Sequence, residues 1–149
     1  MTVTTLAEEP SPTTARATSF VAANRPRAEQ LGHALVEHWG DPAAFAIALR
    51  AGLGSLADPE YLAGQRRVTP GIGTLHGVRW PLLAAVARGF RAETRHDPAA
   101  PLVDIAERLL REPDLEAHWF AFGILERTVS GAPERTWQLL RAAATRAAD

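Results

Sequence analysis

The sequence predicts an all-α protein, built as an array of stacked antiparallel helices. Apolar residues recur at three- and four-residue spacing in several segments, which is the spacing of one helix face. Asp-Pro occurs three times, at Asp41-Pro42, Asp58-Pro59 and Asp97-Pro98, and each pair reads as a helix start. No segment alternates apolar and polar residues for long enough to predict a strand. Short connections between such helices favour neighbours that stack side by side.

The N-terminal third divides into a tail and three helices. Residues 1–17 are rich in Thr, Ser, Pro and Ala and predict a disordered tail, with the helical domain occupying residues 18–149. The first helix is expected over Pro26–Trp39 and ends at Gly40. The second and third helices are expected over residues 42–51 and 59–65.

The middle of the chain holds a glycine-containing loop and two further helices. The loop covers residues 68–78. A helix then opens at Trp80-Pro81 and turns its apolar side inward up to Phe90. Another helix follows Asp97-Pro98 and carries an apolar stripe from Leu102 to Leu110.

The last 37 residues predict two helices, after Asp114 and from Pro133 to Ala148. In the first, Trp119, Phe122 and Leu125 are expected to be mostly buried. The expected stripe of the second consists of four residues, with Leu139 and Ala143 beside it: Trp137, Leu140, Ala144 and Ala147. Asp41, Asp58 and Asp114 are each expected to cap a helix.

Composition limits the class of protein. A chain of 149 residues has room for one domain. The absence of cysteine excludes disulfides and thiolate metal sites. The N-terminal stretch lacks the basic and apolar regions of a signal peptide, and no apolar run approaches the roughly 20 residues that span a bilayer. We therefore expect a soluble, cytoplasmic protein without a membrane segment.

The distribution of charge is more informative than the net charge of −1. All sixteen basic residues are arginine. Six of them lie between residues 62 and 96, where Glu93 is the one acid: Arg66, Arg67, Arg79, Arg88, Arg91 and Arg95. Guanidinium groups suit phosphate, so the segment predicts a nucleic-acid contact. The alternative is that arginine replaces lysine throughout and that these residues form solvated helix faces.

Several segments resemble cofactor or metal motifs but lack the required spacing, so we expect no cofactor and no metal. The glycines of the loop do not follow the G-x-G-x-x-G spacing, and no strand precedes them. The five histidines include no pair four residues apart, and His118 is expected to be a hydrogen-bonded core residue. Asp104 and Glu107 lie one helical turn apart, and a solvated face is the simpler interpretation than an acid–base pair.

Two segments resemble the DNA alkylation repair family of HEAT-like helical-repeat proteins. They are GVRWPLLAAVARGF at residues 77–90 and LLREPDLEAHWFAFGILERT at residues 109–128. The resemblance covers roughly residues 57–149 and implies an α-α superhelix. It also implies a DNA glycosylase that excises cationic alkylated purines and holds duplex DNA on a concave basic face, without a metal or organic cofactor.

The resemblance places the catalytic groups outside the helices of this chain. In the family, a Trp-x-x-x-Asp segment directly follows the helix that here is Pro133–Ala148, and a second catalytic Trp lies further on. We therefore assign no catalytic residue and expect the helical domain to be incomplete at its C-terminus. The predicted DNA-binding residues are Arg66, Arg67, Arg79 and Arg88. The alternative function is a scaffold that binds a protein partner, which is favoured if these arginines are scattered over different faces.

Overall fold

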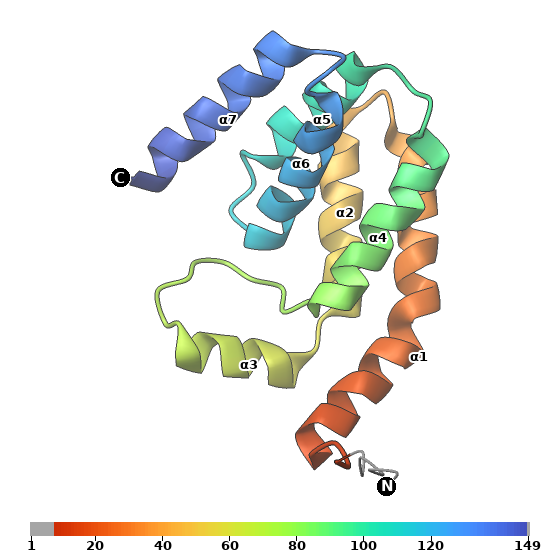
Figure 1. Cartoon of the computed structure of the whole chain (residues 1–149), viewed down its shortest axis with the longest axis vertical. Coiled ribbons are helices and arrows are strands. Elements are labelled where there is room, and N and C mark those ends of the chain that lie inside the picture. The colour runs from red at the N-terminus through yellow and green to blue at the C-terminus, as the bar shows by residue number, and fades with distance from the viewer. Residues whose placement is uncertain (1–7, 149) are drawn as a thin grey trace, which may run out of the picture.

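A computed structural model describes residues 8–148 of the chain (Figure 1). In this range the chain forms seven α-helices and a short 3₁₀ helix: α1 (Pro12–Ala34), η1 (Leu35–His38), α2 (Pro42–Leu56), α3 (Pro59–Val68), α4 (Trp80–Thr94), α5 (Ala99–Leu109), α6 (Leu115–Thr128) and α7 (Pro133–Ala148). Residues 8–148 contain no strand, and one isolated bridge joins Thr74 to Asp114. The predicted all-α array is confirmed.

The helices pack around a central α2. Helix α1 lies along α4, α5 lies along α6, and α2 contacts α1, α5 and α6. Helices α3 and α7 lie at the periphery, and both extend to the left in Figure 1. None of the helices in the described part of the chain is sufficiently long and apolar to cross a membrane.

The centre of the core is a cluster of three phenylalanines from three helices. The ring centroid of Phe45 lies 5.2 Å from that of Phe90 and 6.1 Å from that of Phe120. The centroids of Phe90 and Phe120 are 5.9 Å apart. Each such pair contributes about 0.5–1.5 kcal/mol beyond the apolar area that it buries. The cluster therefore ties α2, α4 and α6 together.

Helices α1 and α4 touch backbone to backbone at a pair of glycines. A Cβ atom on Gly32 would lie 2.1 Å from the carbonyl oxygen of Val86, and one on Gly89 would lie 2.4 Å from that of Glu29. Only glycine permits so close an approach. His33 and Glu93 bridge the same helices, with 2.7 Å between Nδ1 and Oε1.

Three of the expected aspartate caps are confirmed. The side chain of Asp41 accepts a hydrogen bond from Ala44 N at 3.0 Å, Asp58 accepts one from Glu60 N, and Asp114 accepts one from Ala117 N. Asp97 does not cap α5. That helix begins at Ala99, and its N-cap residue is Pro98, which makes no side-chain cap bond.

The prediction that the first helix begins at Pro26 is wrong. Helix α1 begins at Pro12, where Ser11 caps it by accepting a hydrogen bond from Thr14 N at 3.2 Å. Pro26 lies inside the helix on its exposed side. The early turns form because Phe20 and Val21 pack against the core. Residues 12–17 of the predicted tail are thus helical, residues 1–7 lie outside the described range, and the proposed division of the chain stays a prediction.

The predicted faces of α6 and α7 need correction. Leu125 is buried as expected, but Phe122 is 43% exposed and Trp119 is half-buried. The inward side of α6 instead carries Phe120 and Ile124. Both stripes have helical spacing, so periodicity alone does not choose between them. The stripe with Phe120 and Ile124 faces inward because α5 and α2 pack against that side of α6.

In α7 the predicted stripe turns mostly outward. Trp137 is 52% exposed, and Ala144 and Ala147 are also exposed. Leu140 of the predicted stripe does pack against the core, together with Leu139 and Ala143. Thr136 is buried and its hydroxyl lies 2.8 Å from that of Thr128 in α6. A polar contact therefore fixes the start of α7, where sequence patterns predict an apolar one.

Candidate nucleic-acid interface

The structure places the four predicted DNA-binding arginines in three different settings. Arg66 and Arg67 lie in the last turn of α3 and are exposed. Arg79 precedes α4 and is mostly buried, and Arg88 lies on the exposed side of α4. The end of α3 points away from α4 (Figure 1). The six arginines of the basic segment therefore do not share one face, which counts toward the scaffold alternative, and the arginines that do lie together are Arg88, Arg91 and Arg95.

Arg79 is held by groups of the protein itself. Its Nε donates to Oδ2 of Asp58 at 2.8 Å, and its guanidinium carbon lies 4.8 Å from the ring centroid of Tyr61. The side chain is 17% exposed. Its charge is matched by a carboxylate and its flat face lies against a ring. Arg79 therefore links α4 to α3.

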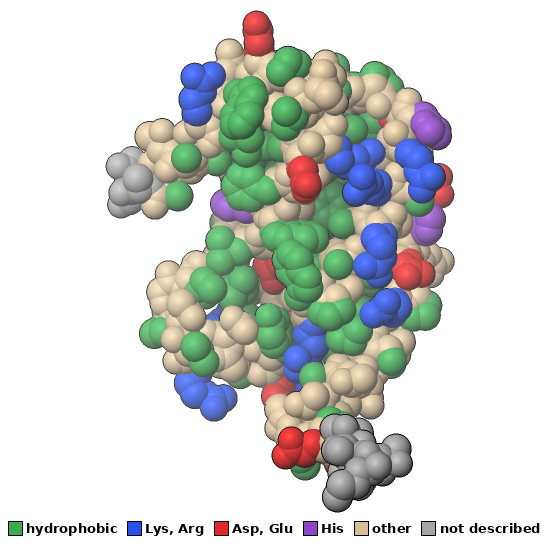
Figure 2. All heavy atoms as spheres, in the orientation of Figure 1, with side chains coloured by type: hydrophobic (Ala, Val, Ile, Leu, Met, Phe, Trp, Pro, Cys, Tyr) green, Lys and Arg blue, Asp and Glu red, His purple; other side chains and the backbone are tan. Residues whose placement is uncertain are grey.

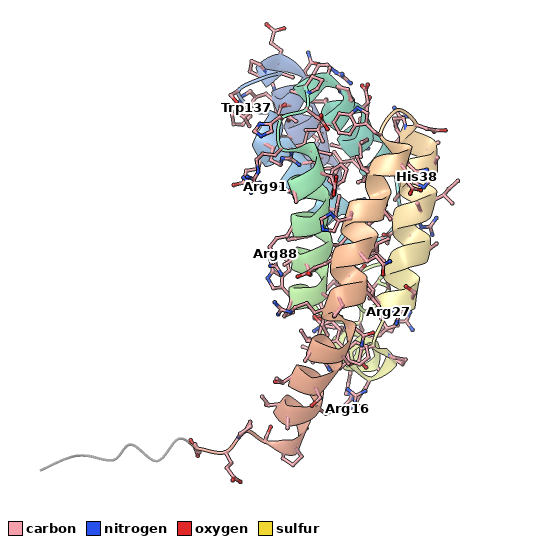
Figure 3. All side chains as sticks on the ribbon, turned by 90° about the vertical axis from the view of Figure 1, so that its right-hand side faces the viewer. Arg16, Arg27, His38, Arg88, Arg91 and Trp137 are labelled. Atoms are coloured by element: carbon pink, nitrogen blue, oxygen red, sulfur yellow. The ribbon has the colours of Figure 1, made fainter. Side chains whose placement is uncertain are left out.

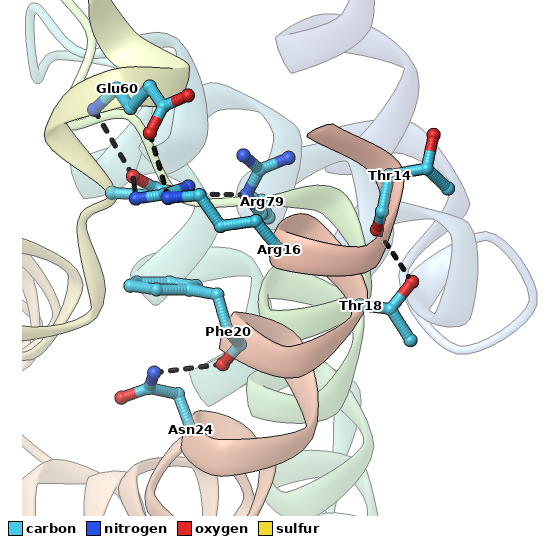
Figure 4. Close-up of polar contacts among 8 residues, drawn as sticks. Thr14, Arg16, Thr18, Phe20, Asn24, Glu60 and Arg79 are labelled. Atoms are coloured by element: carbon cyan, nitrogen blue, oxygen red, sulfur yellow. Dashed lines mark hydrogen bonds and ion pairs between the residues drawn. The ribbon is translucent and has the colours of Figure 1, made fainter. Parts of the chain in front are cut away.

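Asp58 is the centre of this link. Arg16 of α1 donates to both of its oxygens, at 3.1 and 3.2 Å, in addition to the bond from Arg79. Figure 4 shows Arg16 and Arg79 converging beside Glu60 at the start of α3. The hydrogen bond from Arg16 holds the pKa of the Asp58 carboxyl well below its usual range; burial opposes this shift, and the bond from Arg79 adds to it. One buried carboxylate thus joins α1, α3 and α4.

The outer side of α4 carries a different group of arginines. Arg88, Arg91 and Arg95 follow one another at spacings of three and four residues and are all exposed. Arg88 and Arg91 project from α4 on the side away from α1 (Figure 3). The apolar side of the same helix, with Leu82, Val86 and Phe90, is buried. We call Arg88, Arg91 and Arg95 the arginine stripe.

Arg127 of α6 extends the positive charge at the end of α4. It donates to the carbonyl oxygen of Thr94 at 2.9 Å and to the hydroxyl of the same residue at 3.1 Å. Burial lowers the pKa of Arg127, and the nearby charge of Arg91 lowers it further, while Asp97 has the opposite effect. Arg127 and Arg91 thus both place positive charge near the C-terminal end of α4.

The arginine stripe lacks acidic partners within the part of the chain that the structure describes. The ion pairs of the described residues include none with Arg88, Arg91 or Arg95. Figure 2 shows several arginine side chains along the right-hand part of one face of the molecule. Exposed guanidinium groups without an acidic partner are suited to contact phosphates.

The loop between α3 and α4 is ordered by a carboxylate from α6. Oε1 of Glu116 accepts from three consecutive backbone amides, those of His76, Gly77 and Val78, at 3.0, 2.9 and 3.4 Å. Gly77 has φ of 85°, and a Cβ atom there would lie 2.6 Å from that of Leu62. This position requires glycine, and the loop fixes how α4 begins.

Two tryptophans lie where α4 begins. Trp80 is 56% exposed and meets Trp119 of α6 edge to face, with 4.4 Å between ring centroids. A pocket of about 210 Å³ opens beside them, between α3, the loop, α4 and α6. The sequence predicted a mostly buried Trp119, but this residue is half-buried and lines the pocket together with Trp80.

A larger apolar groove lies between α6 and α7. Its volume is about 910 Å³, and its walls include Trp119, Phe122 and Ala143, with Arg111 and Arg146 among its polar residues. In Figure 2 the surface is hollowed on this side, between α7 and α3. Trp119 and Phe122, which the sequence assigned to the core, line this groove.

The remaining candidate groups make ordinary structural contacts. Asp104 and Glu107 are half exposed and both approach Arg135, at 2.8 and 3.5 Å, so they form a solvated ion-pair face. Nε2 of His118 lies 2.6 Å from the carbonyl oxygen of Glu112, in agreement with a hydrogen-bonded role. The described residues contain no group of three or more His, Cys, Asp or Glu that could hold a metal ion.

Comparison with known proteins identifies the family. No curated protein and no solved structure gives a significant match to the chain. The model of the family described as DNA alkylation repair enzyme matches residues 49–149, which is more than half of the chain. The match includes the loop, the arginine stripe and the two tryptophans, and it supports a role in DNA alkylation repair. The chain belongs to the DNA alkylation repair enzyme family.

Proposed function

We propose that this chain binds duplex DNA in alkylation repair and that the arginine stripe of α4 contacts the phosphates. The observation that carries the proposal is the set of three exposed guanidinium groups on one side of α4, none paired with a described carboxylate. Arg127 adds a fourth charge at the end of that helix. Membership in the repair family supports DNA as the polyanion.

The other predicted arginines contribute to different degrees. Arg66 and Arg67 form a second candidate contact at the end of α3. Arg79 acts as a positioning residue, because Asp58 already takes up its charge. Arg79 would hold the start of α4 in place while Arg88 and its neighbours meet the backbone of the duplex.

The substrate we propose is DNA that carries a cationic alkylated purine, as the family resemblance implies. The sequence contains no Trp-x-x-x-Asp segment, which in the family supplies the charge-stabilising pair. We therefore expect base release by the 149-residue chain to be near background, whereas binding persists. A longer chain that adds this segment after Asp149 should release the base.

A salt titration of duplex binding tests the proposal. Each neutralised phosphate contributes a slope of about −0.9 to log K against log salt, so the arginine stripe predicts roughly −3. Replacing all three arginines with glutamine should remove most of this slope, whereas the same replacement of Arg111 and Arg146 should leave it nearly unchanged. Binding that does not depend on salt, or no binding at low salt, would reject the DNA function. A base-release assay on alkylated DNA measures excision separately.

The competing function is a helical scaffold that binds a protein partner. The groove between α6 and α7 favours it, because Phe122 is exposed there and the walls are mostly apolar. Phe122→Glu separates the two functions. The affinity of this variant for duplex DNA should stay within about twofold of the wild-type affinity if α4 makes the contact, since Phe122 lies on a different helix.

A further inference from the structure

The small pocket beside Trp80 combines aromatic rings with one carboxylate. Tyr61 of α3, Trp80 of α4 and Trp119 of α6 contribute three rings from three helices, and Glu116 contributes the acid. Its other lining residues are mainly aliphatic: Ile72, Leu75, Val78, Leu83 and Leu115, together with Gln65 and Gly77. The volume of about 210 Å³ is smaller than the roughly 300–1,000 Å³ of pockets for drug-sized ligands. The pocket therefore suits a single compact group.

The carboxylate of Glu116 is only half satisfied. The residue is 6% exposed, and its Oε1 accepts from the backbone amides of residues 76–78. Its Oε2 is buried and has no hydrogen-bond partner among the described residues. None of the ion pairs within the described range involves Glu116. A buried carboxylate oxygen without a partner is costly, and a cation in the pocket would offset that cost.

The rings are arranged to attract a cation. The face of an aromatic ring carries partial negative charge, and tryptophan provides the strongest such face. Trp80 and Trp119 meet at an interplanar angle of 77°, so they present surfaces in two directions. Tyr61 already contacts the Arg79 guanidinium, but Asp58 matches the charge of that arginine. Arg79 therefore does not neutralise Glu116.

We propose that this pocket binds a methylated ammonium group. A methylated ammonium ion is compact and carries a full positive charge, which the ring faces attract. Its methyl groups are apolar, so their transfer from water to an aromatic wall is favourable. An inorganic cation would require several oxygen ligands, and the pocket offers one carboxylate and one amide side chain. The site is separate from the arginine stripe, so it does not depend on the proposed DNA contact.

Titration with choline tests the site, using NMR of the tryptophan indole groups as the readout. Choline should shift the signals of Trp80 and Trp119 and leave that of Trp137 unchanged, because Trp137 lies on the exposed side of α7. The uncharged analogue, in which a tert-butyl group replaces the trimethylammonium group, should bind at least about tenfold more weakly because it lacks the charge. Equal binding of the two compounds would show an apolar pocket only and would overturn the proposal.

Glu116→Gln tests whether the negative charge of the Glu116 carboxylate is needed for choline binding. Glutamine keeps an oxygen for the three backbone amides and replaces only the unpartnered oxygen with an amide, so the fold should persist by circular dichroism. Choline binding should fall by about tenfold or more, whereas Glu126→Gln, on the exposed side of α6, should leave it unchanged. If Glu116→Gln does not fold, Trp80→Leu provides the second test, because loss of the ring should weaken choline binding more than binding of the analogue. Full choline affinity in either folded variant would overturn the proposal.

Two further ligands separate the sources of the group. A peptide with trimethyl-lysine that binds more tightly than choline would identify a modified protein tail as the source. Comparable affinity for both would identify the small cation itself. Tighter binding of 7-methylguanosine than of either ammonium compound would overturn the proposal in favour of a methylated base.

Discussion

Arg79 and Arg88 belong to the same segment of chain, yet the structure uses them in opposite ways. Arg79 precedes α4 and donates to the buried Asp58 at 2.8 Å, beneath the ring of Tyr61. Arg88 lies further along α4 and is exposed to solvent, and the ion pairs of the described residues include none with it. The residue type and the charge are identical. The position of a carboxylate elsewhere in the fold therefore decides whether an arginine holds the fold together or remains available to a ligand.

The largest expected change in stability comes from removing the carboxylate of Asp58, which binds Arg79 and not Arg88. Asp58→Ala should lower the free energy of unfolding by about 3–5 kcal/mol, because Arg16 and Arg79 lose their buried partner. Urea unfolding measures the change. Asp104→Ala is the matched control, since its ion pair with Arg135 is exposed and should contribute less than about 1 kcal/mol. Equal losses in the two variants would mean that Asp58 does not organise the three helices.

Arg79→Gln should cost about 1–3 kcal/mol of stability, because it leaves a buried acceptor with one partner fewer. Its effect on DNA binding should be small in conditions where the variant is folded. Thermal unfolding and a duplex titration on the same sample measure both quantities. A normal melting temperature combined with lost DNA binding would reverse the roles assigned to Arg79 and Arg88.

The dependence of stability on pH provides a third test. The pKa of Asp58 is depressed in the folded protein, so its contribution is fully present above the pKa of the unfolded chain, near 4, and is lost as the pH falls toward the folded value. The difference in unfolding free energy between the wild type and Asp58→Asn should therefore be constant from pH 7 to about pH 5 and shrink below pH 4. Unfolding curves between pH 2 and pH 7 measure it. A difference that grows on acidification contradicts the depressed pKa.

The smallest expected change in stability comes from Arg88→Gln, at within about 0.5 kcal/mol, because an exposed side chain without a partner is replaced. The same variant should reduce the magnitude of the salt slope of duplex binding by about one. A loss of stability as large as that of Arg79→Gln would show that Arg88 has a structural partner in solution.

Local signals predicted most of the helices, and contacts distant in sequence determined the rest. Asp41, Asp58 and Asp114 cap their helices because capping involves residues only two or three positions away. The early start of α1 at Pro12 depends on packing of Phe20 against a core that the tail composition does not reveal. The contact of Arg79 with Asp58 and that of Glu116 with the loop amides also join residues distant in sequence, so no local pattern predicts them.

At the candidate nucleic-acid interface, too, contacts distant in sequence could not be predicted. Arg88 and Arg66 of the basic segment are both on the surface, and their contact with DNA stays a prediction. Arg79 could not be separated from them, because Asp58 is 21 positions away and no pattern links the two. The inward side of α6 was also ambiguous, because Phe120 and Phe122 belong to two stripes of equal helical spacing.

The contact between Gly32 and Gly89 has a consequence for any duplex that docks on α4. Because the backbones of α1 and α4 touch there, α4 cannot shift or roll without separating from α1. The guanidinium groups are thus carried on a stiff base, so that in the proposed complex any adjustment would fall to the duplex. Bending a duplex costs less at flexible pyrimidine–purine steps than in stiff A-tracts. If the proposed contact forms, duplexes that differ in bendability should therefore differ in their affinity for the chain.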